Sequence, residues 1–298
     1  MKLKFLGFLL LIGMTCQKQT FWESKKAYHG EVPPSNEPRI FMNDIINHLA
    51  HSAPTFTPDG KQIYWSVIGE GDTKRSIQMT EFVNGAWTQP KIAPFSGTYH
   101  DDQPFIAYDG GMIIFASKRP REKDGEDAIG LWVCKRMGNT LKKPVPIPGF
   151  WTPSLTESRN LYCMDLLENV EGARGIARAN WLNGFQPLEF LPESINSKTA
   201  IDWTPFIARD ESYLIFSSHR TGGYGMGDLY ISFRSEDDTW SEPINMGPAI
   251  NTSSQERFPG VSPDGKYLFF TRYLKPPHYH DLYWVKADII EKLKGELK

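Results

Sequence analysis

Short apolar runs separated by turn residues recur along the whole chain. Five of them, at 63–65, 112–115, 161–163, 213–216 and 268–270, contain almost no polar residue. A run without alternation of polar and apolar side chains predicts a β-strand covered on both faces. The only stretch with helical character is "ADIIEKLKGELK" at the C-terminus, so the pattern predicts an all-β chain with a short terminal helix.

Each apolar run belongs to a longer phrase that the chain repeats. The phrase starts at a proline and continues through a tight turn, which reads Pro-Asp-Gly in "FTPDGKQIYWS" and "VSPDGKYLFFTR". The shared prolines are separated by 50, 49, 52 and 54 residues, and they are Pro54, Pro104, Pro153, Pro205 and Pro259. A regular period of this length indicates an array of equivalent structural units.

Each unit contains four expected strands. The first runs from the repeated proline, since proline donates no amide hydrogen and suits a strand start or edge. The second is the apolar run, and a third follows at 77–79, 131–133, 176–178, 229–231 and 282–284. After a turn such as Asn84-Gly85, an outer strand begins near a second proline, for example Pro90 or Pro243. Four antiparallel strands in roughly 50 residues predict the blade of a β-propeller.

Blade number follows from the ends of the array. The fifth unit stops after its third strand, and the segment 38–46 precedes the first unit as an outer strand would. We therefore predict five blades closed by an N-terminal strand, with six blades as the alternative. The expected domains are a signal peptide over 1–15, a lipid-attached tether over 16–37, the propeller over 38–287 and a helix or tail over 288–298.

The Pro-Asp-Gly phrases resemble the WD40-like repeats of TolB-type propellers. The stretch "SSHRTGGYGMGDLYIS" from Ser217 is similar to a phrase common in envelope members of that family. The resemblance covers about 250 residues and implies a propeller fold, but propellers of this kind have many unrelated functions.

The N-terminus indicates export. Lys2 and Lys4 precede an apolar run from Phe5 to Met14, which is typical of a secretory signal and too short to span a bilayer as a mature helix. Cys16 follows directly and resembles the lipidation site of bacterial lipoproteins, with simple cleavage as the alternative. We expect a bacterial envelope protein that is held at a membrane by lipid, on the periplasmic or outer-membrane side.

Composition excludes some functions. The formal charge of −2 and the lack of a basic run give no indication of nucleic-acid binding. We expect no cofactor and no metal, although His278 and His280 have a spacing that a metal could use. Cys134 and Cys163 are expected to be buried thiols, with a disulfide in an oxidising compartment as the alternative, and the protein is expected to be a monomer.

Candidate functional residues are expected on the face of the propeller that carries the long loops between the second and third strands. Three residues before each repeated proline stand His51, Asp101, Phe150, Asp202 and Glu256, with Asp102 adjacent. Carboxylates that converge on a channel mouth can bind a cation or hydroxyl-rich ligands, act as general acid and base, or bond the backbone structurally. Arg119, Tyr224 and Tyr279 are the loop residues expected to contribute to binding.

Two functions follow from these residues. The first is a non-catalytic envelope propeller that binds a protein or glycan through its loop-rich face, which the absence of the Gly-x-Ser-x-Gly and His-Glu-x-x-His motifs favours. The alternative is a carbohydrate-active hydrolase that uses Asp101, Asp202 and Glu256.

Overall fold

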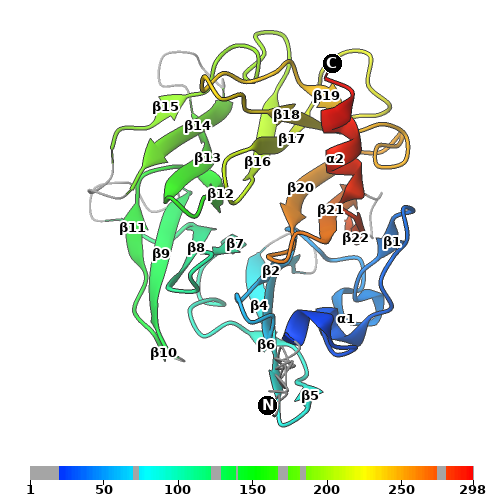
Figure 1. The fold of residues 1–298 in the computed structure, drawn as a ribbon. Coiled ribbons are helices and arrows are strands. Elements are labelled where there is room, and N and C mark those ends of the chain that lie inside the picture. Colours follow the sequence, from blue (N-terminus) through cyan, green and yellow to red (C-terminus); the bar gives the residue numbers. More distant parts are fainter. Residues whose placement is uncertain are drawn as a thin grey trace, which may run out of the picture.

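The strands form five small antiparallel sheets around a central axis, which is the architecture of a five-bladed β-propeller (Figure 1). The computed structural model describes residues 20–69, 74–121, 129–138, 140–166, 174–181, 186–273 and 280–297. The prediction of five blades is confirmed.

Every blade has an inner strand next to the axis, two longer middle strands, and a short outer part. Blade 1 contains β2 (Thr55–Phe56), β3 (Gln62–Ile68), β4 (Arg75–Val83), β5 (Ala86–Trp87) and β6 (Lys91–Ile92). Blade 2 contains β7 (Asp101–Ile106), β8 (Met112–Ser117), β9 (Gly130–Met137), β10 (Thr140–Leu141) and β11 (Val145–Ile147). Blade 3 contains β12 (Trp151–Leu155), β13 (Asn160–Leu166), β14 (Arg174–Asn180) and β15 (Glu189–Phe190). Blade 4 contains β16 (Asp202–Ile207), β17 (Tyr213–Ser218), β18 (Asp228–Phe233) and β19 (Ile244–Asn245). Blade 5 contains β20 (Glu256–Val261), β21 (Tyr267–Tyr273), β22 (His280–Lys286) and β1 (Arg39–Ile40).

The ring closes through the N-terminal strand, as predicted from the sequence. β1 pairs antiparallel with β22, with Arg39 opposite Trp284 and Ile40 opposite Tyr283. The rest of the predicted closing segment is helical instead, because α1 (Asn43–Ile46) follows the strand. The predicted C-terminal helix is present as α2 (Asp288–Gly295), which packs Ile290 and Leu293 onto the outside of blades 4 and 5.

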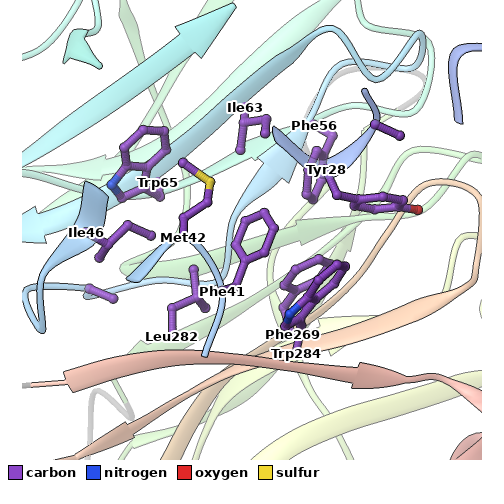
Figure 2. Packing of buried hydrophobic residues seen from close by; sticks show 12 residues of the cluster. Tyr28, Phe41, Met42, Ile46, Phe56, Ile63, Trp65, Phe269, Leu282 and Trp284 are labelled. Atoms are coloured by element: carbon purple, nitrogen blue, oxygen red, sulfur yellow. The ribbon is translucent and has the colours of Figure 1, made fainter. Parts of the chain in front are cut away.

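Adjacent blades pack through apolar layers, and the layer at the closure is the most aromatic. Middle strands are buried on both faces, so each layer takes residues from two neighbouring sheets. Figure 2 shows the layer between blades 5 and 1, where Phe41, Phe269 and Trp284 are at most 1% exposed. Stacked and edge-on ring contacts connect these side chains, so much of the closure is stabilised by aromatic packing.

The segment after Thr20 packs against the propeller. Two 3₁₀ turns, η1 (Phe21–Glu23) and η2 (Tyr28–Gly30), place Trp22 and Tyr28 beside Phe56 at the closure. Trp22 donates its indole hydrogen to the Pro58 carbonyl (2.9 Å), and Tyr28 donates its hydroxyl hydrogen to Asp264. The part of the predicted tether that the structure describes therefore contacts the face that carries the Pro-Asp-Gly turns, which we call the tight-turn face.

A backbone irregularity recurs in four inner strands. The residue before the repeated proline has a positive φ of 50–51°, and at this point the pairing register shifts; these residues are Gln103, Thr152, Thr204 and Phe258. Such a bulge re-aims the neighbouring side chains. The bulge divides each of these inner strands into a start and a remainder. The start lies at the face opposite the tight turns, which we call the loop-rich face.

Candidate functional site

The three acids of the expected carboxylate ring are buried in ion pairs within their own blades. Each pairs with an arginine near the end of the second strand: Asp101 with Arg119 (3.1 Å), Asp202 with Arg220 (3.3 Å) and Glu256 with Arg272 (2.7 Å). The three acidic side chains are at most 1% exposed. We call these contacts the blade ion pairs.

Each blade ion pair also holds the connection from the preceding blade. The arginines donate a second hydrogen bond to backbone carbonyls of that connection, at Phe95, at Ser194 and Ile195, and at Ile250. Burial raises the pKa of Asp101 and of Glu256, and the paired arginines partly offset this effect. The arrangement fastens neighbouring blades and leaves the three carboxylates turned away from solvent.

The five positions predicted to ring the channel mouth therefore differ in their structural environment. Arg119, expected to bind a ligand, is 9% exposed and lies over the Phe115 and Trp132 rings. Phe150 makes an aromatic contact with Trp151. His51 differs again, because it contacts Asp102 from the next blade.

His51 and Asp102 are brought together as a buried pair. The ring nitrogen Nδ1 of His51 lies 2.9 Å from Asp102 Oδ2, and Arg75 Nη1 lies 3.4 Å from the same oxygen. Burial opposes ionisation of Asp102, but His51 and Arg75 outweigh it and hold the pKa of this carboxyl below its ordinary value. Burial lowers the pKa of His51, whereas the neighbouring Asp102 raises it.

Side chains from several blades converge around this pair at the start of the inner strands. Arg75 lies 5.6 Å from the Trp151 ring centroid, although blades 1 and 3 are not neighbours. His51 contacts Phe258 at 4.8 Å and His280 at 5.5 Å between ring centroids. These contacts require the side chains to meet near the axis. We call the group the mouth cluster, and it comprises His51, Arg75, Asp102, Trp151, Trp203, Arg257, Tyr273 and His280.

Arg257 lies between aromatic rings on the other side of the cluster. Its guanidinium is 4.7 Å from the Trp203 ring and 5.7 Å from the Tyr273 ring, and Nη2 donates to the side-chain oxygen of Gln255. Burial, with a contribution from Arg75, lowers the pKa of Arg257 to about 10. Burial and the positive charge of Arg257 and Arg75 lower the pKa of His280 to about 2. The mouth cluster thus combines partly exposed aromatic rings, two arginines, two histidines and the Asp102 carboxylate.

A narrow apolar channel lies below the mouth cluster. It encloses about 70 Å³ and is lined by all five repeated prolines together with Phe105 and Phe206. The repeated proline therefore faces the axis in every blade, which explains its regular spacing. Gln103 and Thr152 also line the channel, and the side-chain polar atoms that they bury have no hydrogen-bond partner among the described residues.

The other predicted residues lie elsewhere. Tyr224 is 49% exposed in the glycine-rich loop of blade 4, where its backbone amide donates to Asp228. Tyr279, His278 and Cys16 lie outside the described residues. Arg220 and Arg272, at the bases of the long loops of blades 4 and 5, pair with Asp202 and Glu256.

The described residues include two cysteines, His280 of the candidate metal-binding pair and both α-helices. Cys134 and Cys163 are buried thiols, as predicted. No group of three His, Cys, Asp or Glu side chains suited to a metal is found within the described ranges. None of the helices described has the length and apolar character needed to cross a bilayer.

Comparison with known proteins gives the fold. No family model matches the chain, and no curated protein matches it. Among solved structures it is similar to a GH43 β-xylosidase/α-arabinofuranosidase from a compost microbial metagenome, with 15% identity, a TM-score of 0.53, and coverage of 86% of this chain and 95% of that one.

Two further structures belong to the same comparison. An α-L-arabinofuranosidase from Lactobacillus brevis matches with 13% identity, a TM-score of 0.51, and coverage of 82% of this chain and 93% of that one. TolB from Acinetobacter baumannii matches with 14% identity and a TM-score of 0.47. The match covers 78% of this chain and 53% of the TolB chain. At this level of identity the likeness identifies the chain as a protein of β-propeller fold and carries no activity with it.

Proposed function

We propose that the protein is a non-catalytic propeller that binds a glycan at the mouth cluster on its loop-rich face. The observation that carries the proposal is the contrast between the two sets of polar residues near the axis. The three acids that a hydrolase would use are each engaged in a blade ion pair and closed off from solvent. The half-exposed Trp151, Trp203 and Tyr273 instead offer flat apolar rings beside polar groups, which suits the stacking of a sugar ring.

The alternative hydrolase has one structural argument in its favour. Two glycosidases share the fold with TM-scores above 0.5. However, general acid and base catalysis requires two carboxyl groups within reach of a substrate. Asp102 is 1% exposed and already contacts His51 and Arg75, so it does not supply a reachable second acid.

Glycan binding is tested with the soluble chain starting at Thr20 on an array of neutral and acidic oligosaccharides. We expect Trp203→Ala to weaken binding roughly tenfold or more, because a buried aromatic contact commonly dominates such an interface. Phe190→Ala is the matched control, since Phe190 is an aromatic residue, 40% exposed, on β15, the outer strand of blade 3. Release of reducing sugar by the wild type would show turnover and reject the non-catalytic proposal. No binding to any oligosaccharide of the array would reject a glycan as the ligand.

Attachment to the envelope through Cys16 is part of the same proposal. Thr20 lies at the tight-turn face, and the four residues from Cys16 span at most about 14 Å. A lipid on Cys16 would hold this face close to the membrane and leave the mouth cluster directed away from it. We expect labelled palmitate to be incorporated into the wild type and not into Cys16→Ser, with the protein shifting from the membrane to the soluble fraction. Equal labelling of both forms would reject the anchor.

A further inference from the structure

Arg257 is a largely buried cation without an anionic partner. No carboxylate of the described residues lies within ion-pair distance of its guanidinium, whereas Arg119, Arg220 and Arg272, near the ends of the second strands, are all paired. Its Nη2 donates to a neutral amide oxygen and its buried Nε has no partner. A desolvated guanidinium is costly unless an anion compensates it, so this position is suited to a negatively charged ligand group.

The surroundings of Arg257 strengthen this argument. Arg75 is close enough to influence its ionisation, and the one carboxylate of the mouth cluster, Asp102, is shared between Arg75 and His51. His280 is 3% exposed, and neither of its ring nitrogens has a hydrogen-bond partner among the described residues. Among the described residues, the cluster therefore has two arginines but one carboxylate, and a buried histidine lies next to them.

The geometry also limits the kind of anion. The flat guanidinium lies 4.7 Å from the centroid of the Trp203 ring and 5.7 Å from that of Tyr273, and its Nη2 donates to Gln255. A guanidinium presents its donors in one plane, which matches the two oxygens of a carboxylate. The adjacent indole ring is placed to contact the sugar that carries this group.

We propose that the ligand is an acidic glycan and that Arg257 recognises the carboxylate of a uronic acid residue, with the sugar ring stacked on Trp203. This inference rests on the proposed glycan-binding function and narrows it to one ligand class. It assigns to Arg257 the role of specificity determinant.

The experiment uses oligosaccharides of glucuronate, galacturonate and mannuronate, each paired with its carboxyl-reduced neutral counterpart and with a sulfated form of that counterpart. Titration calorimetry of the chain from Thr20 should show that the acidic forms bind about 10- to 100-fold more tightly than the neutral forms. Arg257→Gln should remove this difference while leaving the affinity for neutral forms within about threefold. Arg257→Lys should retain part of it, because the charge persists without the planar pair of donors.

Stability separates recognition from a structural role. Because Arg257 has no anionic partner to leave behind, Arg257→Gln should melt at or above the wild-type temperature, and a clearly lower melting temperature would assign Arg257 to structure. Equal binding of acidic and neutral forms would reject the inference and keep the glycan proposal. Preference for the sulfated forms would reject the carboxylate, and no binding to any form would reject both proposals.

Discussion

Asp101→Asn is expected to lower the free energy of unfolding by about 3–5 kcal/mol, because it breaks a buried ion pair from one side. The asparagine side chain keeps the shape of aspartate but leaves the Arg119 guanidinium, whose residue is 9% exposed, without its counter-charge. The same substitution weakens the hydrogen bond that Ser117 donates to the carboxylate at 2.7 Å. Urea unfolding followed by tryptophan fluorescence measures the loss.

Glu157→Gln is the matched control for this measurement. Glu157 pairs with Arg209, but their side chains are 63% and 50% exposed, and solvent screens such a pair so strongly that its loss should leave stability unchanged. Unchanged stability of Asp101→Asn would contradict the structural role of the blade ion pairs and would return Asp101 to the candidates for catalysis. For the same reason, simultaneous neutralisation of Asp101, Asp202 and Glu256 is expected to prevent folding, so loss of binding in such a variant would say nothing about the ligand.

The fold was predictable because a repeated array repeats its physical constraints. A proline that faces the axis, a tight turn and a strand buried on both faces must recur in every blade, so their spacing gave the number of blades and the closing strand. The packing of the segment that contains Trp22 and Tyr28 was not predictable. Its charged and proline-containing sequence is also typical of a linker, and only its aromatic residues indicate burial.

Three members of the mouth cluster lie one residue away from the positions that were predicted to line the channel mouth. Asp102 and the third residue before each proline were predicted to line the channel mouth. His51 and Asp102 do lie in the mouth cluster, whereas the acids three residues before the proline form the blade ion pairs. Asp102, Trp151, Trp203 and Arg257 stand at the second residue before it, and their side chains form the mouth cluster. The bulge at the intervening residue determines which side chain faces the axis, and a positive φ at Gln103 or Phe258 has no recognisable sequence signal. The sequence did contain one signal for the mouth cluster. The second position has an acid, two tryptophans and an arginine, whereas a position of a repeat that serves only packing tends to keep one residue type.

Removal of residues 20–31 is expected to destabilise the propeller strongly, by roughly 5 kcal/mol or more. The segment buries the Tyr28 side chain to 4% exposure and adds Phe21 and Trp22 to the aromatic layer at the closure. Burial of one large apolar side chain contributes about 1.5–3 kcal/mol, and the hydrogen bonds to Pro58 and Asp264 add to this. A chain starting at Val32 would expose Phe56, Tyr267 and Trp284 at the place where the ring is joined.

The comparison is made between chains that start at Thr20 and at Val32, with urea unfolding as the measurement. Tyr28→Phe in the longer chain isolates the hydrogen bond to Asp264, for which about 1–2 kcal/mol is expected, and Tyr28→Ala adds the loss of the ring, for a total of about 3–5 kcal/mol. Equal stability of the two chains would mean that the segment acts only as a tether. A graded loss from Tyr28→Phe through Tyr28→Ala to the truncation would make it part of the closure: because β1 is only two residues long, the ring then depends on side-chain packing from the N-terminal segment as well as on strand pairing.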